Sequence, residues 1–290
     1  QRRTLRPLFA RLRCALCLSA EDEGMHCQCS VARPCPVDSE SYIEMILRRF
    51  RKSAVNFARR VLNRLMRGRR VLVLGDSHSG IFEYSFDHGF LAPHWINCEI
   101  VGGATAYGLN NDASVTGAWQ KYVSALKRHP RFDVVVIVLG ECDCSYALWK
   151  KAEKLGVTPT DLIEHSMRGI RRLVALASPG RCLHDIVLVG SILPSIEDHM
   201  VKTQAIELRR EIAATQLERT KLVLDYNRAL SQISRELGVC YFDLTDRTID
   251  QQTGLLDRRF EAAPDDHHIS HVAAGKLWAN ALLGMLMQRY

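Results

Sequence analysis

Short runs of consecutive apolar residues alternate with longer, helically periodic segments from about residue 70 to the C-terminus. A short apolar run predicts a strand buried on both faces, whereas apolar positions recurring every three or four residues predict a helix with one buried side. The expected strands are 71–74, 96–101, 133–139, 185–189 and 239–242, and the expected helices are 119–127, 161–177, 203–237 and 271–287. This alternation predicts an α/β fold, a doubly wound, five-stranded parallel sheet flanked by helices.

The part before residue 70 has a different character. Residues 1–38 mix Arg, Cys, Pro and acidic residues without periodicity, which predicts a peripheral or poorly ordered segment. Residues 39–69 have apolar positions at near-helical spacing with arginines between them, which predicts a basic amphipathic helix. Residues 1–70 contain 16 Lys and Arg against 6 Asp and Glu, so this part accounts for the net charge of +7.

Two interpretations of the basic helix remain open. It can pack on the 70–290 domain and expose its charges to solvent, or it can bind an anionic surface such as nucleic acid, acidic lipid or glycan. No basic patch interleaved with aromatic residues accompanies it, which argues against nucleic acid.

Composition gives little indication of a membrane or a cofactor. No run reaches the roughly 18 apolar residues of a membrane-spanning helix. Arg11 and Arg13 break the apolar run near the N-terminus and no small-residue cleavage site follows, so a cytoplasmic location is expected. Cys14 and Cys17 have C-x-x-C spacing, but no second such pair follows, so free thiols are expected there rather than a structural metal. No cofactor is predicted.

The first candidate for chemistry follows the first predicted strand. Val71–Leu74 leads into Gly75-Asp76-Ser77, with a helix expected directly after it. This arrangement projects a serine hydroxyl from the edge of the sheet beside free backbone N–H groups, which suits a nucleophile that leaves an oxyanion near those donors. On its own the tripeptide is equally typical of a helix cap.

A second segment near the C-terminus supports the catalytic interpretation. Asp265 precedes His268 by three residues, just before an apolar helix. A carboxylate at this spacing can orient the imidazole, which then takes the proton of a serine as general base and returns it to the leaving group.

Together these segments resemble the SGNH (GDSL-like) hydrolase superfamily over residues 70–290. The resemblance implies a flavodoxin-like, three-layer fold with Ser77 as nucleophile and the pair Asp265 and His268 as its partners. It also implies that Gly103, in the turn after the second strand, donates its N–H to the oxyanion.

The third block of the family pattern differs in this chain. The sequence Gly140-Glu141-Cys142-Asp143 stands where the family has G-x-N-D, so Cys142 replaces the asparagine that donates to the oxyanion. A thiol is a poor donor, and loss of one oxyanion donor costs roughly 3–4 kcal/mol in studied hydrolases. The backbone donors can suffice, a neighbouring group can substitute, or the site can be inactive. Glu141, Asp143 and Asp76 are candidates for contacts with the oxyanion or the substrate.

A divalent metal is the alternative catalyst. Ligand types stand close together near the C-terminus, at Asp265, Asp266, His267, His268 and His271. Neighbouring loops could add Asp76, His78, Glu141 and Asp143. No H-x-H or H-E-x-x-H element supports a zinc hydrolase, so no catalytic metal is predicted.

The predicted function is therefore that of a serine esterase acting on an acyl ester of a small molecule or glycan, such as an O-acetyl sugar. The superfamily resemblance, rather than any residue, suggests the sugar. Two alternatives remain: an acyltransferase to a glycan hydroxyl, and a non-catalytic SGNH-like module that binds a glycan or a protein. Cys142 favours the binding module, whereas the joint presence of Ser77, Asp265 and His268 favours an enzyme.

Overall fold

The computed structural model describes residues 55, 57–198, 211–263 and 266–287. Its centre is a five-stranded sheet in which every neighbouring pair is parallel, in the order β2-β1-β3-β4-β5. The strands are β1 (Arg70–Gly75), β2 (Trp95–Ile100), β3 (Val134–Val138), β4 (Ile186–Val189) and β5 (Cys240–Phe242). All five predicted strands are confirmed, with one or both ends shifted by one residue.

The central strands are buried because their side chains are apolar on both faces. Every residue of β3 and β4 is buried, and only Arg70 of β1 is exposed. Leu72 pairs with Asn97 of β2 on one side and with Val135 of β3 on the other. A strand covered on both faces needs no alternation of polar and apolar positions.

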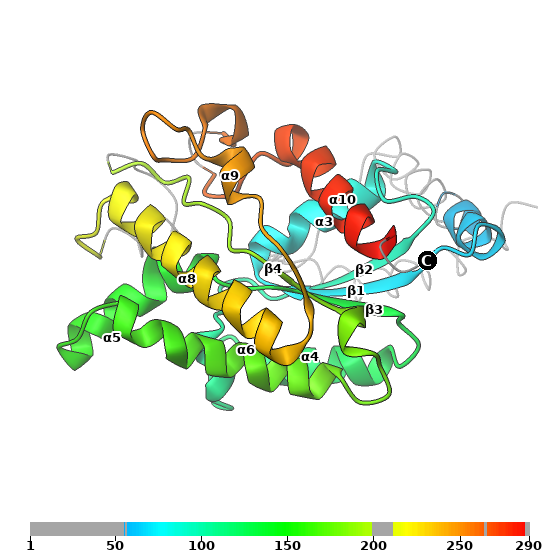
Figure 1. Cartoon of the computed structure of the whole chain (residues 1–290), viewed down its shortest axis with the longest axis horizontal. Helices are drawn as coiled ribbons and strands as arrows, with labels where there is room; N and C mark the ends of the chain where they lie inside the picture. Colours follow the sequence, from blue (N-terminus) through cyan, green and yellow to red (C-terminus); the bar gives the residue numbers. More distant parts are fainter. Residues whose placement is uncertain (1–54, 56, 199–210, 264–265, 288–290) are drawn as a thin grey trace, which may run out of the picture. The chain divides into compact units, whose positions relative to one another are not determined.

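Helices cover both faces of the sheet, which gives the predicted three-layer α/β architecture (Figure 1). Two helices that pack on each other, α3 and α10, lie on one face, and α4, α6 and α8 lie on the other. The helices are α3 (Gly80–Asp87), α4 (Ala118–Arg128), α5 (Leu148–Leu155), α6 (Ile163–Ala177), α8 (Gln216–Leu237), α9 (Thr245–Thr248) and α10 (His271–Met287). No helix among the described residues is long and apolar enough to cross a membrane.

The helix predicted at 203–237 begins later than expected. Residues 211–215 are not helical, and α8 begins at Gln216, while 203–210 lie outside the described residues. The start is fixed by a capping box, in which Thr215 accepts from the backbone of Glu218 and the Glu218 side chain accepts from the backbone of Thr215. The prediction was wrong over 211–215 because this local signal was not used.

The predictions for residues 1–38 and for most of the 39–69 helix lie outside the described residues. Residues 57–65 are helical, but they turn the opposite face to the domain from the one expected. The side chains of Phe57 and Leu65 are 70% and 77% exposed. Arg59 instead lies 3.3 Å from the Asp87 carboxylate and 4.5 Å from the centre of the Phe86 ring. The long arginine stem and its planar guanidinium can pack on an aromatic ring, so charge alone does not identify the solvent face.

Candidate functional site

Ser77 lies at the carboxyl end of β1, at the start of the 3-10 turn η2 (Ser77–Ser79). Two hydrogen bonds shape this turn: Asp76 Oδ1 accepts from the N–H of His78 at 2.9 Å, and Ser79 Oγ donates to the Asp76 carbonyl at 2.6 Å. Gly75 allows the close approach of the chain, since a Cβ there would lie 2.6 Å from the carbonyl oxygen of Val138 and 2.7 Å from Cβ of Ser79. The serine is thereby held, partly exposed, where strand turns into helix.

The histidine predicted as general base lies in the loop before α10, and a carboxylate holds it. Oδ1 of Asp266 lies 2.6 Å from Nδ1 of His268 and accepts from its backbone N–H at 2.9 Å. Partial burial opposes ionisation of Asp266, but the hydrogen bonds from His268 outweigh it and lower the pKa of this carboxyl. Asp265, expected in this role, lies outside the described residues, so Asp266 is the described partner of the ring. With Nδ1 engaged, Nε2 of His268 is left to exchange protons.

His78, the neighbour of Ser77, lies between two buried carboxylates. Its Nδ1 is 3.5 Å from Asp76 Oδ1 and 3.5 Å from Glu141 Oε2, and the three residues are 1–3% exposed. Burial of an isolated carboxylate is strongly unfavourable, whereas a nearby imidazolium compensates its charge. The two acidic residues of the first and third motifs therefore share one basic partner.

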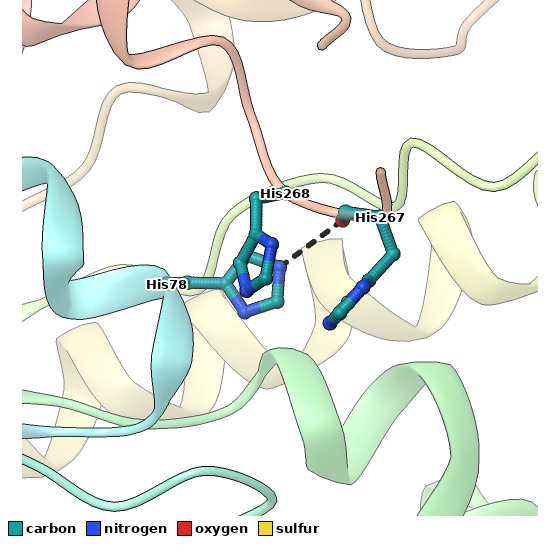
Figure 2. Close-up of side chains that lie close together, drawn as sticks. All are labelled: His78, His267 and His268. Atoms are coloured by element: carbon teal, nitrogen blue, oxygen red, sulfur yellow. Dashed lines mark hydrogen bonds between the residues drawn. The ribbon is translucent and has the colours of Figure 1, made fainter. Parts of the chain in front are cut away.

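The other ring nitrogen of His78 connects the serine turn to the histidine loop. Nε2 lies 3.3 Å from the carbonyl oxygen of His267, which accepts a second hydrogen bond from Ser195 Oγ at 2.7 Å. Because a carbonyl oxygen only accepts, this nitrogen of His78 is the donor. Figure 2 shows this contact and the three imidazoles of His78, His267 and His268 lying beside one another.

These contacts bring residues 189 positions apart to one edge of the sheet. The ring centres of His78 and His268 are 4.8 Å apart, and Ser77 directly precedes His78 in the chain. Among the described residues no hydrogen bond joins Ser77 Oγ to His268. Catalytic hydrogen bonds are often longer before substrate binds, so this arrangement is compatible with a serine and its base.

The turn after β2 contains Gly103, the residue predicted to donate its N–H to the oxyanion. Gly103 has a φ of +69°, a conformation that favours glycine, and the N–H of Ala104 donates to the Val101 carbonyl at 3.0 Å to close the turn. Within the described part of the chain, no acceptor takes the N–H of Gly103 or that of Ser77. Both N–H groups are therefore available to an oxyanion.

The loop after β3 carries the variant motif. Gly140 has a φ of +138°, and a Cβ there would lie 2.5 Å from Cε1 of Tyr226, so only glycine fits. Cys142 is 8% exposed and begins a single π-helical turn over Asp143–Ala147. Its side chain offers a thiol where the family pattern has an amide, as the sequence indicates.

Asp143, a predicted substrate contact, is 0% exposed and its carboxylate is already used inside the protein. It accepts from the N–H of Ala106 at 2.7 Å, from the N–H of Tyr107 at 2.9 Å and from Ser166 Oγ at 2.8 Å. Burial raises the pKa of Asp143 to about 6 against the opposing effect of these three donors. The residue ties the turn after β2 to the loop after β3 and to α6.

Sequence reasoning did not assign three contributors to this site. His78 was considered only as a metal ligand, Asp266 as a metal ligand and as a substitute for Asp265, and Ser195 not at all. The D-D-H-H sequence offered either aspartate as the partner of His268. Nothing in the local sequence indicates that Ser195 holds the carbonyl of His267, because the two are 72 residues apart.

Comparison with solved structures identifies similar folds at low sequence identity. The inhibitor-bound aryl esterase of M. smegmatis matches with a TM-score of 0.50 and 16% identity, covering 75% of this chain and 100% of that one. A carbohydrate acetylesterase family member from Sinorhizobium meliloti matches with a TM-score of 0.49 and 17% identity, covering 75% and 99%. A GDSL-like lipase from Bacteroides thetaiotaomicron matches with a TM-score of 0.48 and 17% identity, covering 75% and 88%.

Neither the models of known protein families nor the curated protein sequences contain a match. The fold alone is therefore what these likenesses establish. The chain has the strand order β2-β1-β3-β4-β5, a Gly-Asp-Ser turn after β1 and a histidine before the last helix, and its α/β fold is similar to that of the M. smegmatis aryl esterase.

Proposed function

We propose that the protein is a serine esterase that hydrolyses small acyl esters. The observation that carries the proposal is the convergence of two loops at one sheet edge: the serine turn after β1 and the loop of His268, whose Nδ1 lies 2.6 Å from the Asp266 carboxylate. A nucleophile, a base and a group that orients the base are the parts that acyl transfer requires.

The proposed reaction proceeds through a covalent acyl-enzyme. Ser77 Oγ attacks the ester carbonyl carbon as its proton passes to Nε2 of His268, and Asp266 stabilises the imidazolium that results. The alkoxide formed from the carbonyl oxygen accepts hydrogen bonds from the N–H groups of Ser77 and Gly103. Collapse of this intermediate expels the alcohol, which takes the proton from Nε2, and water then releases the acid by the same steps.

Asp266 takes the place proposed for Asp265 on the basis of its contact with the ring. The backbone turn supports this choice, because the same Oδ1 of Asp266 also accepts from the N–H of His268 and so fixes the carboxylate on the Nδ1 side. The aryl esterase with the similar fold makes aryl acetates reasonable first substrates. An O-acetyl group on a sugar remains a proposal drawn from the superfamily resemblance.

The test is hydrolysis of p-nitrophenyl acetate by the full chain, with EDTA present and absent. We expect turnover that withstands EDTA and falls by at least about a thousandfold in Ser77→Ala. The matched control is Ser124→Ala, which removes an exposed hydroxyl on α4 and leaves the rate unchanged. A fluorophosphonate probe should label the wild type at Ser77, as located by mass spectrometry.

Two outcomes favour the alternatives. Probe labelling without ester hydrolysis favours an acyltransferase. In that case the serine is reactive, but the acyl-enzyme needs a hydroxylated acceptor that the assay does not contain. If the probe does not label the protein and no ester is hydrolysed, the result favours a binding module and contradicts the proposed esterase.

A further inference from the structure

Three histidines meet at the proposed active site although no sequence motif joins them. His78 comes from the turn after β1, and His267 and His268 come from the loop before α10 (Figure 2). One ring nitrogen from each lies within 4.8 Å of the others. His78 is buried, whereas His267 and His268 are partly exposed, so the cluster is open to solvent on one side.

Carboxylates lie beside the same nitrogen, Nδ1, of two of the three rings. Asp266 contacts Nδ1 of His268 at 2.6 Å, and Asp76 and Glu141 both lie 3.5 Å from Nδ1 of His78. In zinc sites a carboxylate typically accepts the proton of the non-ligating ring nitrogen, which fixes the tautomer and makes the opposite nitrogen a better ligand. Here that opposite nitrogen is Nε2 in both residues.

The three ring nitrogens are nearly as close together as the ligand nitrogens around a bound zinc ion. Tetrahedral zinc with Zn–N bonds of about 2.0–2.1 Å sets its ligand nitrogens about 3.4 Å apart. The separation of up to 4.8 Å is therefore about 1.4 Å too wide, and closing it requires the imidazoles to approach one another and the His267 carbonyl to turn away from Nε2 of His78. His78 would release the proton that Nε2 shares with the His267 carbonyl, as ligation of a protonated imidazole requires.

We propose that His78, His267 and His268 form a Zn²⁺-binding site that shares His268 with the catalytic machinery. Three imidazoles without a thiolate suit zinc and leave its fourth position to water. Zinc on Nε2 of His268 occupies the lone pair that would take the proton of Ser77. Metal binding and ester hydrolysis then exclude each other, a consequence that rests on the proposed esterase function, whereas the binding itself does not.

The experiment titrates the full chain with ZnCl₂ in competition with a chromophoric chelator. Because cysteines near the N-terminus can also bind zinc, the informative quantity is the difference between variants. We expect His267→Ala to bind one zinc ion fewer per chain than the wild type. His88→Ala, which removes an exposed histidine that stacks on Tyr84, should bind as the wild type does. A Cys14→Ser/Cys17→Ser variant should retain the ion that His267→Ala loses.

Activity gives a second, separable readout. In the wild type, zinc should inhibit p-nitrophenyl acetate hydrolysis at the concentration at which the His267-dependent ion binds, and in His267→Ala inhibition should require about tenfold or more zinc. Equal zinc binding by wild type and His267→Ala would overturn the site. If His267→Ala binds one zinc ion fewer but the wild type hydrolyses no ester, the zinc site is supported and the proposed esterase function is rejected. Hydrolysis that increases with zinc would overturn the mutual exclusion.

Discussion

The buried Asp143 allows a quantitative test of how the turn after β2, which contains Gly103, is held in place. Asp143→Asn keeps the shape of the side chain but replaces one acceptor oxygen with a donor. In the native protein the carboxylate accepts from two backbone N–H groups, those of Ala106 and Tyr107, one on each oxygen. Whichever way the amide is turned, its NH₂ therefore faces a backbone N–H. At pH 4 the acid is protonated, but it can direct its single O–H to Ser166 Oγ while both of its oxygens still accept from the backbone N–H groups, whereas an amide NH₂ cannot accept. An unsatisfied buried donor costs about 1–3 kcal/mol, so the variant should be less stable by this amount at pH 4.

The difference in the free energy of unfolding between the wild type and Asp143→Asn should also depend on pH. Burial raises the pKa of Asp143 to about 6 from the 3.8 of a free aspartate, so the folded state favours the protonated acid. The stability that this carboxyl contributes is fully present below pH 3.8 and is lost as the pH rises through about 6. One pKa unit corresponds to about 1.4 kcal/mol, so the advantage of wild type over Asp143→Asn should shrink by about 2–3 kcal/mol between pH 4 and pH 7.

Equilibrium urea unfolding at pH 4, 5, 6 and 7, followed by tryptophan fluorescence, measures this difference for the two proteins. Asp161→Asn is a control of opposite sign, because Thr158 donates to the exposed Asp161 carboxylate and lowers its pKa. The stability that Asp161 contributes is therefore present at neutral pH and lost as the pH falls. A wild-type advantage over Asp143→Asn that stays constant or grows with pH would refute the reasoning, since the three donors would then outweigh burial.

Three further changes test the site. Asp266→Ala should lower kcat for p-nitrophenyl acetate by about 10³–10⁴-fold, because it removes the carboxylate that lies 2.6 Å from Nδ1 of His268. Asp265→Ala should change kcat by less than about tenfold, and the reverse result would restore Asp265 to the triad. Cys142→Asn should raise kcat by about tenfold or more by adding an amide donor, and an unchanged kcat would show that no third donor is missing. Gly140→Ala should reduce the free energy of unfolding by about 2–5 kcal/mol, measured in urea, because of its φ of +138° and the contact with Tyr226.

The sheet could be predicted from sequence because parallel strands buried on both faces are continuous apolar runs. Val134–Val138 is a clear case, since five β-branched residues have few alternatives to a buried strand. Prediction failed where residues typical of a helix continue beyond its actual end, as they do before Gln216. It also failed where the chain forms a short irregular helix. The π-helical turn at Asp143–Ala147 depends on the tertiary hydrogen bonds of a buried carboxylate, which no local periodicity indicates.

The candidate site was predictable in its parts but not in its connections. Ser77 and His268 could be proposed because each stands in a short motif at a strand or helix boundary. The segment of residues 57–65 shows the opposite case, in which an amphipathic pattern gave the wrong face. Periodicity identifies two faces of a helix, and the packing of arginine stems on Phe86 and Trp95 decides which one contacts the domain.

Two features of this chain, Glu141 in the third motif and His78 after Ser77, can be understood together once the fold is known. A glutamate in the third motif would be an uncompensated buried charge if it stood alone, and that would favour a decayed site. His78, which follows Ser77, compensates this charge when its ring is protonated, since its Nδ1 lies 3.5 Å from Glu141 Oε2 and the opposite nitrogen contacts the loop of the proposed base. The acidic third motif thus does more than omit an oxyanion donor. Glu141 and the carbonyl of His267 lie beside opposite nitrogens of one imidazole, so the third motif is connected through His78 to the loop of the proposed base.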